Sequence, residues 1–267
     1  MRFAFSITKY KFLKSLFNID NSFIFAKIFE MTRLSVNINK VALIRNARGE
    51  GLPNLVQVAK DCESFGAEGI TVHPRPDERH IRYSDIPELK EVVSTEFNIE
   101  GNPTDRFMEM VLKHKPHQAT LVPDKPGALT SDSGWDTISN AEFLKEVTAK
   151  LQDAGIRVSI FVNAKPEFVE GAKAVGADRI EFYTGDFARS FHANPEEAVK
   201  AHVEAAKKAN EVGIGINAGH DLNLDNLRYY KESVPGLLEV SIGHALISDA
   251  LYYGFKNTIQ MYRAKLD

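Results

Sequence analysis

The sequence predicts an α/β protein with the (β/α)8, or TIM-barrel, fold. From residue 33 onward, short runs rich in β-branched and aromatic residues alternate with stretches that have the periodicity of amphipathic helices. The chain offers eight such pairs, which is the number that closes this barrel. A doubly wound open sheet would usually carry a Gly-rich dinucleotide loop after its first strand, and none follows residue 38. We therefore expect a barrel.

The predicted elements alternate along the chain in order. Apolar runs predict strands at residues 34–38, 69–72, 97–100, 118–122, 157–162, 179–183, 213–217 and 239–242. Apolar residues at helical spacing predict helices at about residues 53–65, 85–94, 103–114, 140–154, 165–175, 195–211, 223–231 and 245–263. Glycine adopts the left-handed backbone conformation that commonly ends a helix, and it stands after four of them, at Gly66, Gly155, Gly176 and Gly213.

Residues 1–30 differ in composition from the rest of the chain. They contain seven phenylalanines and five Lys or Arg residues, but only Asp20 and Glu30 as acids. Lysines interrupt the apolar stretch, which makes it a poor secretory signal peptide. We interpret these residues as an N-terminal extension outside the native fold, with Met31 as the true start, and a targeting or membrane-binding segment is the alternative. No Pro/Ser/Gly-rich linker divides residues 31–267, which we expect to form one barrel domain.

Composition narrows the classes of partner. The chain has 267 residues and a formal net charge of −3, which gives no reason to expect nucleic acid or a charged membrane surface as a partner. No apolar run approaches the about 18 residues that a membrane-spanning helix needs. Cys62 is the only cysteine, so an internal disulfide and a cysteine-based zinc site are excluded. We expect a cytoplasmic protein that acts on small molecules.

The loop after the second predicted strand contains the densest group of reactive side chains. The strand at 69–72 opens into a loop that carries His73, Arg75, Arg79, His80 and Arg82. So many cationic and titratable groups past the carboxyl end of a strand suggest an anionic substrate and proton transfer. The alternative is a solvated basic loop without a function.

Other polar residues also gather at strand ends, where TIM barrels carry their active sites. They are Asn37, Asn39, Lys40, Arg45 and Arg48 around the first strand end, Glu100 at the third, and Asp124, Lys125 and Thr130 after the fourth. Gly-His pairs at 219–220 and 243–244 end the last two strands, which is the usual phosphate site of this fold. Two turn glycines with incidental histidines are the alternative interpretation.

Three side chains are acid–base candidates. His73 and Glu100 suit proton transfer near neutral pH, because partial burial raises the pKa of a carboxyl group. Glu181 lies within a strand, and alternation places it inside the barrel, where it could stabilise a cationic intermediate. An internal ion pair with Arg157 or Arg179 is its alternative. No metal is expected, because no His or carboxylate pair occurs at ligand spacing on a single element.

The motifs in combination closely resemble those of the pyridoxine 5′-phosphate synthase family, over about residues 32–265. They are Asn37-Ile38-Asn39-Lys40, Arg45-Asn46-Ala47-Arg48-Gly49, the loop Gly69–Ile81, Asn98-Ile99-Glu100, Leu121-Val122-Pro123, Asn217-Ala218-Gly219-His220 and Ile242-Gly243-His244. The resemblance implies a transferase-class synthase that needs no cofactor and forms a homo-octamer. It implies the condensation of 3-amino-2-oxopropyl phosphate with 1-deoxy-D-xylulose 5-phosphate to pyridoxine 5′-phosphate, phosphate and water.

The resemblance also implies roles for the residues at matching positions. The catalytic set is His73 and Glu100 as proton acceptors, His220 as proton donor and Glu181 as transition-state stabiliser. The implied ligands of the aminoketone phosphate are Asn37, Arg48, Gly243 and His244. The implied ligands of the pentulose phosphate are Arg75, His80 and Thr130.

The chain departs from the family pattern in two places. Asn39 and Lys40 stand where many members have Asp-His, at a contact with the pentulose phosphate that Lys40 could remake. Asp221 follows the proton donor where a glycine is common, and its backbone N–H could still bind phosphate. We expect a variant with intact activity.

Two alternative functions differ from this expectation. Another TIM-barrel enzyme that handles one phosphosugar, such as an isomerase or aldolase, would need only one anion-binding cluster, whereas this chain offers two. A catalytically inactive barrel used as a binding module would not need His73, Glu100, Glu181 and His220 together.

Overall fold

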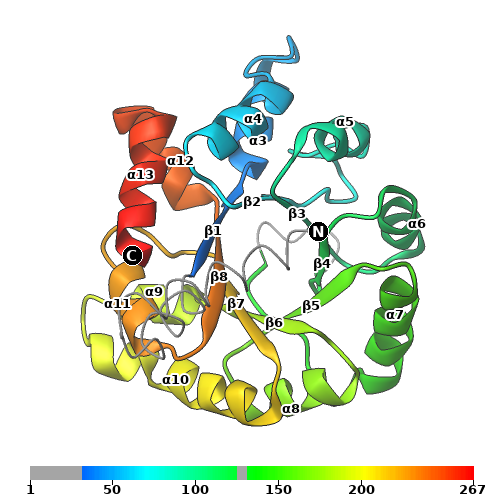
Figure 1. Ribbon diagram of the computed structural model, residues 1–267, viewed down its shortest axis with the longest axis vertical. Coiled ribbons are helices and arrows are strands. Elements are labelled where there is room, and N and C mark those ends of the chain that lie inside the picture. Colours follow the sequence, from blue (N-terminus) through cyan, green and yellow to red (C-terminus); the bar gives the residue numbers. More distant parts are fainter. Residues whose placement is uncertain (1–31, 125–130) are drawn as a thin grey trace, which may run out of the picture. The chain divides into compact units, whose positions relative to one another are not determined.

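The structure is a computed structural model that describes residues 32–124 and 131–267, and within them the strands close into a parallel barrel (Figure 1). Consecutive strands pair in parallel, and β8 closes the ring against β1. The strands are β1 (Arg33–Asn37), β2 (Gly69–Val72), β3 (Glu96–Gly101), β4 (Gln118–Leu121), β5 (Arg157–Val162), β6 (Arg179–Tyr183), β7 (Gly215–Gly219) and β8 (Leu237–Ile242). The predicted (β/α)8 fold is confirmed. The predicted extension at residues 1–30 lies outside the described residues.

Helices surround the barrel, and nearly all lie where helical periodicity predicts them. These are α4 (Leu55–Ser64), α5 (Asp85–Val92), α6 (Asp105–His114), α7 (Ala141–Asp153), α8 (Pro166–Ala174), α10 (Pro195–Val212) and α11 (Leu227–Ser233). The single helix predicted at 245–263 is instead two helices, α12 (His244–Tyr253) and α13 (Phe255–Leu266), because Gly254 between them takes a φ of 75°.

Two helices are absent from the sequence prediction. Helix α3 (Asn39–Arg48) begins directly after β1, and no side chain caps its first turn, so the sequence carries no start signal there. Helix α9 (Gly185–Ser190) has six residues, too few to show a helical period. Both helices follow a strand at its carboxyl end, and α3 supplies Asn39 and Lys40.

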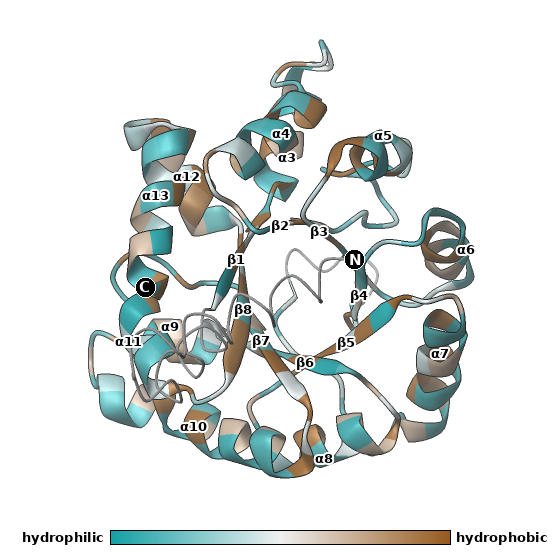
Figure 2. Cartoon of the chain, viewed as in Figure 1, coloured by the Kyte–Doolittle hydropathy of each residue, from teal (hydrophilic) through white to brown (hydrophobic). Residues whose placement is uncertain are grey.

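The strands present apolar side chains outward, toward the helices. Val36, Ile70, Ile99 and Ile160 are fully buried in one large cluster with the helix side chains. The brown apolar stripes of the helices face the strands, and their teal polar faces lie outside (Figure 2). The hydrophobic core therefore lies between the barrel and the helices.

The barrel interior, in contrast, is polar. Ser35 and Thr71 share a hydrogen bond of 2.7 Å, and Thr120 donates to Asn98 Oδ1 at 3.1 Å. Most barrels of this fold fill the interior with branched apolar residues. Here the interior is held by hydrogen bonds, which satisfy polar groups that burial would otherwise leave costly.

At the amino-terminal end of the strands, buried and half-buried charged residues form a paired network that we call the barrel floor: Arg33, Glu96, Arg157, Arg179 and Glu239. Glu96 pairs with Arg33 at 3.2 Å and with Arg157, which lies two strands away. Arg179 pairs with Glu239 at 3.3 Å. Because β3 and β5 are not neighbours, the Arg157–Glu96 pair crosses the barrel interior.

Candidate functional site

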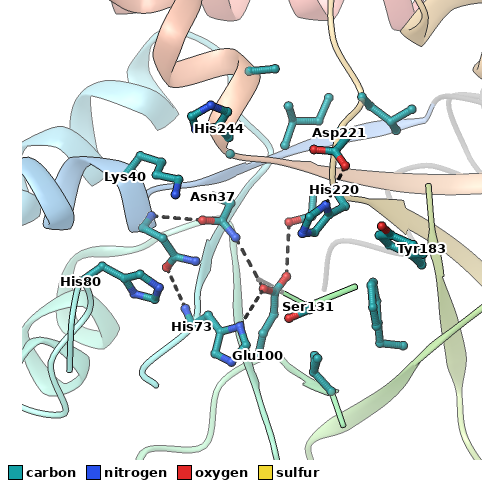
Figure 3. Close-up of a pocket in the computed structure, with 18 of the residues that line it drawn as sticks. Asn37, Lys40, His73, His80, Glu100, Ser131, Tyr183, His220, Asp221 and His244 are labelled. Carbon is teal, nitrogen blue, oxygen red and sulfur yellow. Dashed lines mark hydrogen bonds and ion pairs between the residues drawn. The ribbon is translucent and has the colours of Figure 1, made fainter. Parts of the chain in front are cut away.

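A cavity of about 460 Å³ opens at the carboxyl end of the strands, and we call this end the barrel mouth (Figure 3). It collects predicted site residues from separate strands, as the fold requires. The predicted residues that line it are Asn37, Asn39, Lys40, His73, Arg75, His80, Glu100, Glu181, His220, Asp221, Gly243 and His244. Arg48 lies outside this lining and is exposed, with its Nε 3.2 Å from Glu50. Thr130 lies outside the described residues.

His73 is buried between two carboxyl groups. Its Nε2 lies 2.9 Å from Asp124 Oδ2, and its Nδ1 lies 3.7 Å from Glu100 Oε2. Its backbone N–H donates to Asn39 Oδ1 at 2.9 Å, which fixes the turn that leaves β2. Burial lowers the pKa of His73, although Asp124 opposes this effect. A neutral imidazole at neutral pH is the form that can accept a proton.

Glu100, at the end of β3, is placed for proton transfer. It is buried, and it accepts long hydrogen bonds of 3.5 Å from Asn37 Nδ2 and Ser241 Oγ. Burial first, and then the charge of Asp124, raise the pKa of Glu100 to about 8. A carboxyl group with this pKa can both give and take a proton near neutral pH.

Glu181 lies inside the barrel on β6, as its place in the strand predicts. Burial raises its pKa well above the usual range, and the charges of Glu100 and Glu239 add to this effect. Its Oε2 is buried without a hydrogen-bond partner among the described residues. The alternative ion pair with Arg157 or Arg179 is not found, since both guanidinium groups pair at the barrel floor.

The backbone of β7 leaves room for Glu181. A Cβ atom at Gly219 would lie 2.3 Å from Glu181 Oε1, so any larger residue there would displace the carboxyl group. The glycine of the first Gly-His pair is therefore explained by its close approach to Glu181.

His220, the next residue, has a left-handed backbone conformation with a φ of 80°. This conformation is uncommon for a residue with a side chain, and such strain often occurs at functional sites. The imidazole packs edge-on against Tyr183, with ring centroids 5.4 Å apart, and its Nδ1 lies 3.1 Å from Asp221 Oδ2. The His220 contact is the first cause that lowers the pKa of Asp221. The Asp221 carboxylate is thus partnered by His220.

The first cluster for an anion lies where β8 meets α12. Gly243 precedes the helix, and His244 and Ala245 in its first turn line the cavity. The free N–H groups of a helix start favour negative charge. A Cβ at Gly243 would meet the Asn37 side chain at 3.1 Å, so the glycine lets Asn37 approach this turn.

The second cluster lies on the loop after β2. Arg75 and His80 are buried beside the cavity, and Lys40 approaches from α3. Burial lowers the pKa of His80 to about 3, so this ring is neutral at neutral pH. His80 Nδ1 accepts from the N–H of Ile81 at 2.9 Å, which leaves Nε2 as the hydrogen-bond donor.

Asp124, which contacts His73, and the cavity-lining residues Ser131, Tyr183 and Arg189 have no role predicted from the sequence. Of these, Arg189 lies on the unpredicted helix α9 and donates to the Tyr183 hydroxyl at 3.1 Å. Asp124 follows a predicted strand, but its contact with His73 joins segments 51 residues apart. No local sequence signal marks such a pairing.

The described residues contain no group of three or more His, Cys, Asp or Glu side chains arranged to hold a metal ion. Cys62 is buried away from the cavity lining, and burial raises its pKa to about 12. Across residues 32–124 and 131–267, none of the helices is long and apolar enough to cross a membrane.

Comparison with known proteins gives a consistent result. Residues 34–267 match the family model "Pyridoxal phosphate biosynthesis protein PdxJ". A pyridoxine 5′-phosphate synthase of Cytophaga hutchinsonii is 61% identical over 236 residues, which cover 88% of this chain and 99% of that protein. The enzyme of the same name from Bacteroides thetaiotaomicron is 61% identical over 233 residues, which cover 87% of this chain and 98% of that protein.

Solved structures of lower identity share the fold. A thiamine phosphate pyrophosphorylase from Pyrococcus furiosus is similar with a TM-score of 0.58 at 13% identity, over 89% of this chain and 96% of that one. At this identity the likeness concerns the barrel alone.

Proposed function

The chain belongs to the PdxJ family of pyridoxal phosphate biosynthesis proteins, and we propose that its barrel mouth carries out the pyridoxine 5′-phosphate synthase reaction with the residues described above. This reaction condenses 3-amino-2-oxopropyl phosphate with 1-deoxy-D-xylulose 5-phosphate. Its products are pyridoxine 5′-phosphate, inorganic phosphate and water. The chain is accordingly an enzyme of vitamin B6 biosynthesis.

One observation carries the assignment of the site. Two anion-binding clusters and four titratable groups line a single cavity, and the reaction has two phosphorylated substrates. Imine formation, loss of water and ring closure need several proton transfers and no redox carrier. We propose that the chain needs no metal or organic cofactor for these steps.

We assign the proton transfers to titratable groups on both sides of the mouth. Neutral His73 accepts a proton, Glu100 accepts one in its ionised form, and His220, on the opposite side of the mouth, is the proton donor. Glu181 stabilises positive charge that develops on the substrate nitrogen. Its Oε2 has no partner among the described residues, so a cationic intermediate would supply the missing charge.

We assign one phosphate to each cluster. Asn37, Gly243 and His244 bind the aminoketone phosphate at the start of α12. Arg75 and His80 bind the pentulose phosphate, and Lys40 with Asn39 remakes the contact that Asp-His provides in many members. Thr130 and the backbone of Asp221 remain assigned to substrate binding. Arg48 is assigned to the aminoketone phosphate, although its side chain is exposed in this structure.

Two matched variants test the separation of the clusters. His244→Ala should raise the KM for the aminoketone phosphate about tenfold, and Lys40→Met should raise the KM for the pentulose phosphate by a similar factor. Each variant should leave the other KM within about twofold of wild type. If both variants raised the KM of the same substrate, the site would be that of an enzyme with one phosphosugar substrate.

We propose that the protein assembles as a homo-octamer. The neighbouring helices α3 and α12 expose apolar side chains, including Leu43, Ile44, Leu251 and Tyr252. Apolar side chains gathered on a surface favour burial against another subunit. Sedimentation equilibrium should give eight times the chain mass, and a monomer would overturn the proposal.

We also propose that residues 31–267 suffice for activity and that the protein acts in the cytoplasm. The family match begins at residue 34, and the C. hutchinsonii enzyme is covered almost completely without residues 1–30. A chain that starts at Met31 should match the full chain in kcat and in unfolding midpoint. A loss of either would show that residues 1–30 belong to the native fold.

A further inference from the structure

Asp124 has no role in the assignments above, yet it is the carboxylate nearest to His73. It follows β4, its side chain is 7% exposed, and its Oδ2 lies 2.9 Å from His73 Nε2. The other ring nitrogen, Nδ1, faces Glu100 at 3.7 Å. The two nitrogens of His73 therefore have different partners from different strands.

Asp124 is itself held in place and held ionised. Ser131 donates to its Oδ1 at 2.8 Å, and an Arg75 guanidinium nitrogen lies 3.2 Å from its Oδ2. Burial alone would raise the pKa of Asp124, but His73 and Arg75 together lower it below its usual value. An ionised carboxylate can only accept hydrogen bonds.

The contact between Asp124 and His73 fixes the position of the imidazole hydrogen. Two lone pairs would repel each other at 2.9 Å, so the close contact with the Asp124 carboxylate favours the hydrogen on Nε2. In the neutral ring, Nδ1 is then the free lone pair, and it points to Glu100 (Figure 3). Nδ1 therefore faces the Glu100 carboxyl group across 3.7 Å, which is longer than a direct hydrogen bond.

We propose that Asp124 is a positioning residue that holds His73 in the Nε2–H tautomer, so that Nδ1, on the side of the ring that faces Glu100, is the catalytic base. This inference rests on the proposed role of His73 as a proton acceptor. Asp124 acts through the imidazole and does not need to touch a substrate. A carboxylate that orients a histidine base is an arrangement known to have large effects on rate.

The surroundings of His73 support a neutral base. The charged or titratable groups that face it are Asp124, Glu100, Arg75, Arg79 and His80. The two arginines disfavour an imidazolium ion, as burial does, and Asp124 opposes them. Removing the Asp124 charge should therefore shift the acidic limb of the pH–rate profile to lower pH as well as change the tautomer.

The test uses the full-length protein and the variant Asp124→Asn, with Asp153→Asn as the matched control. Asp153 is an exposed residue at the end of α7, so the same chemical change there should leave both kinetics and stability unchanged. An Asn amide at position 124 can donate to Nε2, which favours the hydrogen on Nδ1 and blocks the base. We expect kcat to fall about 100-fold or more while the KM of each substrate changes less than about threefold.

A second measurement does not depend on activity. The ¹⁵N chemical shifts of His73, assigned by comparison with His73→Gln, report which nitrogen carries the hydrogen. Wild type should show the Nε2–H tautomer, and Asp124→Asn should show Nδ1–H. An Nδ1–H tautomer in wild type, or a wild-type kcat in a folded Asp124→Asn, would overturn the inference.

The two measurements also separate this inference from the proposed function. If wild type failed to turn over but held the Nε2–H tautomer, the reaction assignment would fail while the role of Asp124 would stand. If Asp124→Asn did not fold, the wild-type tautomer and the pH–rate profile of Ser131→Ala would still show whether Asp124 positions His73. Ser131→Ala weakens the hold on Asp124 and should lower kcat by less than the Asn variant does.

Discussion

At the barrel floor, Glu96 lies against the guanidinium groups of Arg33 and Arg157. At the barrel mouth, Glu181 is equally buried, but its Oε2 has no hydrogen-bond partner among the described residues. Both side chains point into the same polar interior, from strands of the same parallel barrel. They differ in what they contact.

This difference separates a structural carboxylate from a reactive one. A buried carboxylate that faces arginines already has partners for its charge and has little to offer a substrate. A buried carboxylate without such a partner keeps its proton, costs stability, and can respond to charge that a substrate brings. Glu96 is thus paired away from the cavity, whereas Glu181 lies in the cavity lining with its Oε2 unpartnered among the described residues.

The largest effect should come from Glu181→Gln. The amide keeps the shape but cannot take up negative charge, so we expect kcat to fall about 1000-fold. The free energy of unfolding should rise by about 1 kcal/mol at pH 7, since the folded variant no longer holds a proton that the unfolded chain releases. Phosphate-release kinetics and urea unfolding measure the two effects. A variant with normal kcat would show that Glu181 at the barrel mouth is not reactive, and so does not differ from Glu96 in this respect.

Stability should also depend on pH through Glu100. Its pKa is raised from 4.5 to about 8 in the folded protein, so between these values the folded state binds the proton and the unfolded state does not. The contribution of Glu100 to the free energy of unfolding is fully present below about pH 4.5. It is lost as the pH rises toward about 8, by at most about 1.4 kcal/mol per pH unit. Urea unfolding at pH 5, 6, 7 and 8 should show a shallower decline for Glu100→Gln. Identical slopes would contradict the assigned pKa.

Glu96→Gln makes the converse change at the barrel floor. It removes the charge that Arg33 and Arg157 share, and we expect the free energy of unfolding to fall by about 2 kcal/mol. The effect is moderate because both arginines are partly exposed. The kcat should stay within about twofold of wild type, because Glu96 lies outside the cavity lining. A loss of kcat with unchanged stability would show that Glu96 serves catalysis and not the stability of the fold.

The smallest effect should come from Asp221→Asn. Asp221 is an exposed acid at the mouth whose charge His220 already partners, so it differs from both buried glutamates. Removing one screened negative charge near a bound phosphate should lower a substrate KM by about threefold. Initial rates with each substrate varied in turn measure it. A rise in both KM values would instead show that the carboxylate helps to hold the substrates.

The sequence predicts most of the barrel, because each strand and each long helix carries its own local pattern. It also predicts that Glu181 points inward, since alternation along β6 is local. It does not predict that Glu181 Oε2 lacks a hydrogen-bond partner among the described residues. Arg179 lies on β6 together with Glu181, and Arg157 lies on the neighbouring strand β5. Only the three-dimensional register of the strands places both arginines at the barrel floor.

The site residues divide in the same way. His73, Glu100 and His220 could be found because each ends a predicted strand. The contact of Asp124 with His73 depends on loops brought together by barrel closure. The Tyr183–Arg189 pair is local, but it depends on helix α9, which is too short to show a helical period in the sequence. Arg48 matches its motif, and in this structure its exposed side chain lies outside the cavity lining.

The two-substrate condensation at the barrel mouth is tested most directly by turnover of the purified protein, with phosphate release and the absorbance of pyridoxine 5′-phosphate followed together. With both substrates, we expect equal amounts of phosphate and pyridoxine 5′-phosphate. With either substrate alone, we expect neither product. Phosphate released from one substrate alone, or no product from both, would contradict the assignment of the barrel mouth as a two-substrate condensation site.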